Sequence, residues 1–123
     1  MSDTSPNFRY PGQEKLKSKK EITLLFEKGK WFTCGHLRII TLPQADLQVP
    51  KLAVSVSKRN FKKATDRNRV KRLLREAYRL NKSEFVQAFG SSGISMLFWA
   101  SSKKPEHYQE VEAQFLKLCR NQK

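Results

Sequence analysis

The sequence has little of the chemistry that protein enzymes and metal sites need. Its 123 residues include two histidines, His36 and His107, and two cysteines, Cys34 and Cys119, which form no Cys-x-x-Cys pair. This spacing indicates neither a zinc site nor a disulfide framework, so we expect both cysteines to be free thiols in a reducing cytoplasm. No nucleophile stands beside a base, and no acids cluster as two metal ions would require. We therefore expect no catalytic residue and no metal ligand in the protein itself, and we interpret both histidines as surface or edge residues.

Long apolar runs are missing as well. The opening residues, MSDTSPNFRYPGQEK, contain no apolar stretch of signal-peptide length, and no later stretch approaches the length of a membrane span. We expect a cytoplasmic protein without a membrane partner.

Acidic residues are scarce relative to basic ones. Lys and Arg total 25 against 11 Asp and Glu, which gives a net charge of +14 at pH 7. Such an excess indicates a polyanionic partner, with nucleic acid as the first candidate. Hydrophobic residues make up 38% of the chain and aromatic residues 11%, which is enough to build a core. The charge is therefore expected to lie on the surface of a folded domain.

The length and the turn residues predict a single domain. Residues 1–14 are rich in Ser, Pro, Asn and Gly and are expected to form a flexible tail. The domain then covers residues 15–123, in the order helix, strand, strand, basic helix, strand, helix. No internal repeat or low-complexity linker interrupts this order.

A short first helix is predicted after the tail. Ser18 and Glu21 form a capping box, and Gly29 suits the left-handed conformation that ends many helices. Between them one apolar stripe is formed by Ile22, Leu25 and Phe26.

Two strands are predicted over residues 37–42 and 51–57, joined by a loop with two prolines. One pair of faces carries Leu37, Ile39, Leu52, Val54 and Val56. The opposite pair carries Arg38, Ile40, Ala53, Ser55 and Ser57. If the strands pair, one face of the sheet is apolar and the other is mixed and partly basic, as an extended polar ligand would need.

The C-terminal part predicts one more strand and one more helix. Residues 94–100, ISMLFWA, have the continuous apolar character of a central strand that is buried on both faces. Pro105 suits the first turn of a last helix. The apolar stripe of that helix consists of Tyr108, Val111, Phe115 and Leu118.

The most informative segment is the basic run over residues 58–82. It contains eleven Lys or Arg and two acids, so this segment alone carries +9. Apolar residues at helical spacing predict that one side packs on the domain: Val70, Leu73, Leu74, Ala77 and Tyr78. The other side would offer forked guanidiniums and point-like ammoniums to phosphate groups. The alternative is a merely solvated helix face, which the scarcity of acids disfavours.

Two further features allow two interpretations each. Asn68 could contact a base, a ribose or a metal-bound water, or it could belong to the helix start, where Thr65 and Asp66 are good cap residues. Phe26 could stack on a single-stranded base beside the mixed face of the sheet, or it could simply pack.

The segment SVSKRNFKKATDRNRVKRLLREAYR strongly resembles the signature of the bacterial ribonuclease P protein component, the small basic partner of a catalytic RNA. Arg67-Asn68-Arg69 and the residues after it carry most of the resemblance. The order of the flanking elements agrees as well, so the resemblance covers roughly residues 15–118.

The resemblance implies a fold and a function. The fold is α+β, ribosomal-protein-like, with a mostly antiparallel sheet of about four strands, three helices and a left-handed βαβ crossover, although the usual rule favours the right hand. The implied holoenzyme removes the 5′ leader of precursor tRNA by hydrolysing one phosphodiester. The RNA is the catalyst and holds most of the magnesium, no organic cofactor is needed, and the protein is expected as a monomer in a one-to-one complex.

The resemblance also implies two sets of site residues. The set for the catalytic RNA and its metal sites is Lys58, Arg59, Lys62, Lys63, Arg67, Asn68, Arg69, Lys71, Arg72 and Arg75. The set for a cleft that holds the single-stranded leader is Ile22, Phe26, Arg38, Ile40, Ala53 and Ser55. Ile22 and Phe26 match positions that are commonly aromatic, and Ile22 departs from that pattern.

Two other functions remain as alternatives. A ribosome-like structural RNA-binding module would share the fold and the charge but would have no role in tRNA maturation. A nuclease in its own right would cleave without an RNA cofactor, which the lack of a catalytic constellation disfavours.

Overall fold

The computed structural model describes residues 15–121 apart from residues 17, 45–49 and 91. The flexible tail expected over residues 1–14 lies outside this part of the chain.

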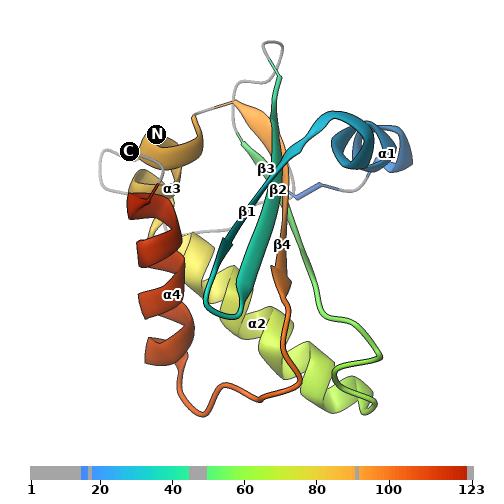
Figure 1. Ribbon diagram of the computed structural model, residues 1–123, viewed down its shortest axis with the longest axis vertical. Helices are drawn as coiled ribbons and strands as arrows, with labels where there is room; N and C mark the ends of the chain where they lie inside the picture. Colours follow the sequence, from blue (N-terminus) through green and yellow to red (C-terminus); the bar gives the residue numbers. More distant parts are fainter. Residues whose placement is uncertain (1–14, 17, 45–49, 91, 122–123) are drawn as a thin grey trace, which may run out of the picture.

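The elements are α1 (Lys19–Lys28), β1 (Lys30–Cys34), β2 (Leu37–Pro43), β3 (Lys51–Ser55), α2 (Ala64–Leu80), α3 (Lys82–Phe89), β4 (Gly93–Trp99) and α4 (Tyr108–Arg120). The strands form one sheet in the order β1-β2-β4-β3, in which only β3 and β4 are parallel. Figure 1 shows α1 on one face of the sheet and α2 and α4 on the other. The structure confirms the α+β class, the four-stranded, mostly antiparallel sheet and the central position of β4.

Two elements were missing from the sequence prediction. Strand β1 is an edge strand in which only Cys34 is buried, so no apolar alternation marks it. It joins β2 through Gly35, whose φ of 59° lies in the left-handed region. Helix α3 follows α2 after a single residue, Asn81, so the described residues contain four helices where three were expected.

Strands β2 and β3 do not pair with each other, but the expected faces are confirmed. Strand β4 lies between β2 and β3, because β2 is antiparallel and β3 parallel to it. Leu37, Ile39 and Leu52 belong to the core beneath α2 and α4. Ile40 and Ala53 belong to a smaller core beneath α1. Side-chain alternation assigns residues to faces without fixing which strands are neighbours.

Helix α1 begins as predicted and ends differently. The Ser18 side chain accepts a hydrogen bond from the Glu21 backbone N–H, as in a capping box. Gly29 is not left-handed, since its φ is −73°. A Cβ atom there would lie 2.5 Å from the Leu25 carbonyl oxygen and 2.7 Å from Cγ1 of Ile40. Gly29 is needed because helix and sheet approach closely, not for its backbone conformation.

The last helix also starts later than predicted. Pro105 lies in the loop before α4, where it is buried, and His107 is the N-cap of the helix. The apolar stripe of the helix is confirmed, because Val111, Phe115 and Leu118 are buried.

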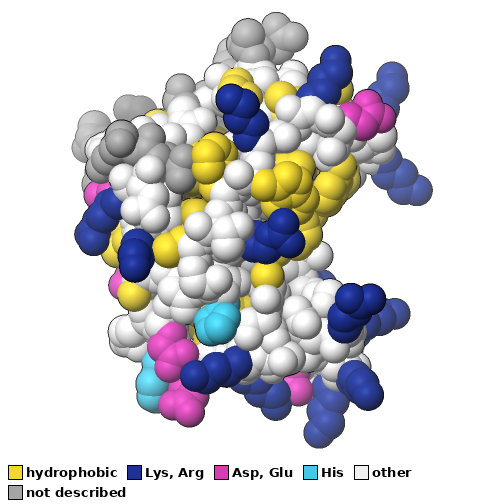
Figure 2. All heavy atoms as spheres, in the orientation of Figure 1, with side chains coloured by type: hydrophobic (Ala, Val, Ile, Leu, Met, Phe, Trp, Pro, Cys, Tyr) yellow, Lys and Arg dark blue, Asp and Glu magenta, His cyan; other side chains and the backbone are white. Residues whose placement is uncertain are grey.

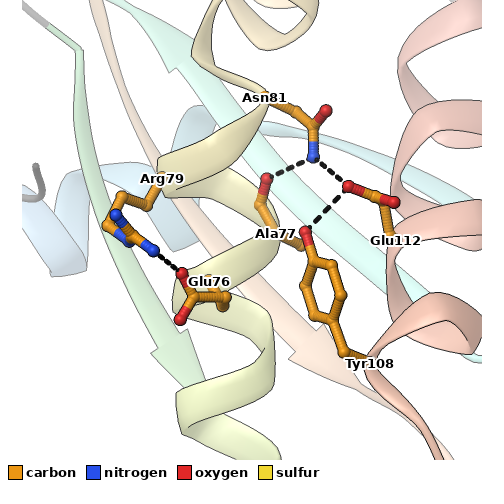
Figure 3. Close-up of polar contacts among 6 residues, drawn as sticks. All are labelled: Glu76, Ala77, Arg79, Asn81, Tyr108 and Glu112. Atoms are coloured by element: carbon orange, nitrogen blue, oxygen red, sulfur yellow. Dashed lines mark hydrogen bonds and ion pairs between the residues drawn. The ribbon is translucent and has the colours of Figure 1, made fainter. Parts of the chain in front are cut away.

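A polar cluster joins the end of α2 to α4 (Figure 3). The Asn81 side chain donates hydrogen bonds to the Ala77 carbonyl at 2.9 Å and to Glu112 at 3.1 Å, and the Tyr108 hydroxyl donates to the same Glu112 oxygen at 2.9 Å. Burial and the Glu112 carboxylate raise the pKa of Tyr108 well above its usual range. This cluster ties the C-terminal end of α2 to α4.

Cys34 and Cys119 are both buried and, as expected, are not joined in a disulfide. Among the described residues, no helix combines the length and the apolarity that crossing a membrane requires.

We predict that Gly29→Ala destabilises the protein by roughly 1–3 kcal/mol, because the added methyl group overpacks the contact between α1 and β2. Urea denaturation of the two proteins measures this difference. Thr23→Ala, at an exposed position of the same helix, is the control and should change the free energy of unfolding by less than about 0.5 kcal/mol. An unchanged free energy for Gly29→Ala would contradict the close approach.

Candidate nucleic-acid interface

Helix α2 presents a row of uncompensated cations. Val70, Leu74, Ala77 and Tyr78 are buried against the sheet, which turns Arg72 and Arg75 outward to solvent. Within the described part of the chain, neither guanidinium makes a hydrogen bond or an ion pair. Lys71, on the same helix, is half-buried.

The loop before α2 adds further charge. Its exposed cations are Lys58, Arg59, Lys62 and Lys63. Figure 2 shows Lys and Arg side chains gathered at the lower right, where α2 begins in Figure 1. The helix and this loop together form the basic surface, which we define as residues 58–63 and the exposed side of α2.

Arg67 and Arg69 are placed differently from the other cations. Nη1 of Arg67 donates to the carbonyl oxygens of Phe61 and Lys62, both at 2.9 Å. Both guanidiniums are half-buried. Arg67, which was predicted to bind RNA, thus donates its hydrogen bonds to backbone oxygens of the protein.

The guanidinium of Arg69 bonds a different loop. Nη1 donates to the Pro105 carbonyl at 2.6 Å and Nη2 to the Glu106 carbonyl at 3.0 Å. One turn of helix earlier, Asp66 accepts an ion pair from Lys104 of the same loop at 3.1 Å. The loop between β4 and α4 is thereby tied to the start of α2.

The cap residues expected for α2 are wrong. The N-cap is Lys63, which makes no side-chain capping bond, so Thr65 and Asp66 lie inside the first turn. Asn68 is exposed one turn into the helix, and in the described part of the chain its amide has no partner. The interpretation of Asn68 as helix-end chemistry therefore loses its basis, while its interpretation as a polar contact stays a prediction.

An aromatic pocket of about 250 Å³ lies on the α1 face of the sheet. Phe26 and Trp31 are 46% and 42% exposed, respectively, and their ring centroids lie 6.0 Å apart. The ring centroid of Phe98 lies 5.4 Å from that of Trp31, and Cζ of the Arg38 guanidinium lies 4.6 Å from the Trp31 ring centroid. Figure 2 shows this hollow as a notch lined by hydrophobic side chains on the right of the molecule. We call it the aromatic cleft; its lining is Phe26, Trp31, Arg38, Ser55, Ser57, Asn60, Phe98, Trp99 and Ala100.

The structure brings together half of the residues expected to bind the leader. Phe26, Arg38 and Ser55 line the aromatic cleft. Ile22 and Ala53 are half-buried and pack on the smaller core, and Ile40 is fully buried in it. Ile40 therefore has no exposed surface with which to contact a ligand, because α1 covers it at Gly29.

Sequence reasoning missed Trp31 and Phe98 in this cleft. Trp31 was missed because β1 was not predicted. The only available sequence signal was a tryptophan next to a lysine, Lys30, which is a pairing that can bind nucleic acid. Phe98 was missed because the run ISMLFWA was interpreted as buried on both faces, whereas Phe98 is half-exposed.

The cleft and the basic surface are continuous. Ser57 and Asn60 line the cleft and belong to the loop that carries Lys58 and Arg59. The Asn60 backbone N–H donates to the Ser57 hydroxyl at 3.2 Å, which fixes this turn. One extended polyanion could therefore contact both. Among the described residues, no three His, Cys, Asp or Glu side chains are grouped to hold a metal ion.

Comparisons with known proteins all point to one family. The family model described as Ribonuclease P matches residues 10–123. The chain is 43% identical over 79 residues to the ribonuclease P protein component of Porphyromonas gingivalis W83, and the match covers 63% of this chain and 58% of that protein. It is 30% identical over 109 residues to the ribonuclease P protein component of Clostridium botulinum Loch Maree, and this match covers 88% of this chain and 93% of that protein. The chain thus spans about three fifths of the length of the Porphyromonas relatives.

Solved structures share the fold. The RNase P protein of Staphylococcus aureus matches with a TM-score of 0.74 at 18% identity, covering 88% of this chain and 94% of that one. The RNase P protein of Thermotoga maritima matches with a TM-score of 0.73 at 22% identity, covering 87% and 96%.

We predict that Arg75→Gln stabilises the free protein at low salt by about 0.2–0.5 kcal/mol, because it removes repulsion between charges four residues apart on α2. The gain should vanish near 1 M salt, where the Debye length is about 3 Å. Chemical denaturation at the two salt concentrations measures it. Lys104→Gln, which removes the ion pair with Asp66, is the control and should not stabilise. A loss of stability for Arg75→Gln at low salt would contradict repulsion between the exposed cations of α2.

Proposed function

Because this chain belongs to the ribonuclease P protein family, we propose that it is the protein subunit of a ribonuclease P. In this role it binds the catalytic RNA and the 5′ leader of precursor tRNA and assists the endonucleolytic removal of the leader. The observation that carries the proposal is the exposed side of α2: Arg72 and Arg75 have no acidic partner among the described residues, and the other side of the helix is buried.

The basic surface is the proposed contact with the catalytic RNA. Arg72 and Arg75 can make forked hydrogen bonds to phosphate oxygens, since no side chain in the described ranges engages them. Asn68 lies beside them and can donate and accept at once, as a ribose or a base requires. Lysines 58, 62 and 63 add point charges on the adjoining loop. Such contacts fix orientation and supply affinity but do not read sequence.

The aromatic cleft is the proposed contact with the leader. Phe26 and Trp31 expose ring surface on which unpaired bases can stack, and the Arg38 guanidinium supplies a cation beside them. Stacking tolerates any base, which suits a strand whose sequence differs between substrates. Because Ser57 and Asn60 connect the cleft to the basic surface, one RNA complex can occupy both.

The chemistry of cleavage is proposed to belong to the RNA. The described residues offer no grouped metal ligands, so we propose that magnesium ions are held mainly by RNA, where they would supply a nucleophile and charge stabilisation. The protein binds and orients: it lowers electrostatic repulsion between two RNAs and holds the leader in place. We also propose a cytoplasmic location and a one-to-one complex with the RNA.

Neither alternative function is supported by the comparisons. The relatives are named ribonuclease P protein components, not ribosomal proteins. A nuclease acting alone would need a catalytic group, and the histidines offer none: His36 packs on Trp99 with ring centroids 5.2 Å apart, and His107 is the exposed N-cap of α4.

Reconstitution tests the proposal. Mixed with the cognate catalytic RNA and a precursor tRNA at low magnesium, the protein should produce the mature 5′ end much faster than the RNA alone, because its cations replace magnesium in screening phosphate charge. Gel analysis of the products under single-turnover conditions measures the rate. Cleavage by the protein alone would indicate a nuclease, and no gain on mixing would favour a structural RNA-binding module.

We predict that Trp31→Ala weakens holoenzyme binding of precursor tRNA by roughly 5- to 150-fold, the range expected for about 1–3 kcal/mol of base–aromatic stacking. Binding of mature tRNA, which has no leader, should not change. Leu80→Ala, which removes a comparably exposed apolar side chain (37%) from the far end of α2, is the matched control. Equal losses for precursor and mature tRNA would place the leader outside the cleft.

A further inference from the structure

Arg67 and Arg69 bind backbone oxygens of two loops that lie far apart in the sequence. The first loop precedes α2, and Arg67 bonds the carbonyls of Phe61 and Lys62. The second joins β4 to α4, and Arg69 bonds the carbonyls of Pro105 and Glu106, which are 36 and 37 residues away in the sequence. Two neighbouring guanidiniums therefore hold both loops against the same end of one helix.

We propose that Arg67 and Arg69 are positioning residues of the RNA interface, which act through the lysines of these loops instead of through their own contacts with phosphate. The inference rests on the proposed role of α2 in RNA binding. It also assigns Lys103 and Lys104, which sequence reasoning did not select, to the basic surface.

The second loop carries the strongest argument. It has three attachments besides its covalent ends: the Arg69 fork, the ion pair of Lys104 with Asp66 at 3.1 Å, and the hydrogen bond from Trp99 Nε1 to the Lys103 carbonyl at 2.9 Å. Lys103 and Lys104 are exposed. In Figure 1 this loop runs along the bottom of the molecule and passes the start of α2. The loop lysines are thereby presented beside the helix at fixed positions.

Fixed positions matter for binding a polyanion. A mobile loop would have to lose conformational freedom when its lysines meet phosphates, and this loss would weaken binding. The guanidinium bonds impose the order before RNA arrives. They also commit one N–H of each Nη of Arg69 to a carbonyl oxygen, which leaves fewer donors for a phosphate.

The geometry distinguishes arginine from lysine. Arg69 bonds two successive carbonyls with two separate nitrogens, which needs the planar fork. A lysine keeps the positive charge but has a single nitrogen. Arg69→Lys would therefore lose at least one of the two carbonyl bonds. Arg69→Ala separates the two roles, because only the loss of a phosphate contact would lower the salt dependence of RNA binding.

The test measures affinity of the protein for the catalytic RNA over a range of salt concentrations. For Arg69→Lys we expect a loss of roughly tenfold, similar to Arg69→Ala, with an unchanged salt dependence. Arg72→Ala and Arg75→Ala, which remove proposed phosphate contacts, should each lower the slope of log K against log salt by roughly 0.7–0.9. Wild-type affinity for Arg69→Lys, or a slope that falls with Arg69→Ala, would overturn the inference.

A measurement without RNA separates this inference from the proposed function. In the free protein, the Lys103 amide donates to Ser101 and the Glu106 amide to Glu110. Hydrogen exchange at both should speed up in Arg69→Lys, while the buried stripe of α2 stays protected. Unchanged loop exchange would overturn the positioning role. If exchange speeds up but no variant of α2 changes the salt slope, the proposed RNA contact fails instead.

A second variant keeps the test valid if Arg69→Lys does not fold. Lys103→Ala combined with Lys104→Ala removes two exposed ammonium groups, one of which makes the ion pair with Asp66, and we expect it to weaken RNA binding and to lower the salt slope. In the Arg69→Lys background the same pair should cost less, because the loop must then lose conformational freedom before its lysines can contact phosphate. Full additivity, or no effect of the lysine pair, would overturn the inference.

Discussion

The packing of α2 on the sheet determines where the positive charge of this protein can act. Val70, Leu74, Ala77 and Tyr78 bury one side of a helix that is otherwise rich in Arg and Lys. Without this contact the like charges would repel one another and the segment would gain little from being helical. With it, the charges are held in a row, and a bound anion would relieve the repulsion that Arg72 and Arg75 feel from their basic neighbours.

The same contact makes the start of α2 a junction between loops. Arg67 and Arg69 reach the loops on either side because the helix is already fixed, and Asp66 adds an ion pair to Lys104. The Asn81, Tyr108 and Glu112 cluster holds the other end of the helix (Figure 3). One helix is thus anchored by polar bonds at both ends and by apolar contacts between them, which leaves only its outer side for a ligand.

The sequence was sufficient to predict on which face of the sheet a residue lies, but insufficient to predict which strands are adjacent. Alternation placed Arg38 and Ser55 on one face correctly, but it could not show that β4 separates their strands. Trp31 was missed because an edge strand with one buried residue has no apolar period. Ile40 shares the face of Arg38 yet is covered, since only the tertiary fold shows how closely α1 approaches at Gly29. The roles of Arg67 and Arg69 could not be predicted either, because their partners are backbone oxygens, which leave no trace in the sequence.

The two surfaces differ in the physics they use, and the loop between them explains how they can act together. In the proposed function, the basic surface would bind through charge, which acts at a distance and weakens with salt, whereas the aromatic cleft would bind through ring contact, which is local and salt-tolerant. Ser57 and Asn60 line the cleft, and the same loop continues to Phe61 and Lys62, whose carbonyls Arg67 holds. A change in the position of that loop would therefore move one wall of the cleft and several cations of the basic surface at once. If RNA binds α2 and the leader binds the cleft as proposed, this short segment sets the spacing between them, and the segment is held by the guanidinium of Arg67 and by the hydrogen bond from Asn60 to Ser57.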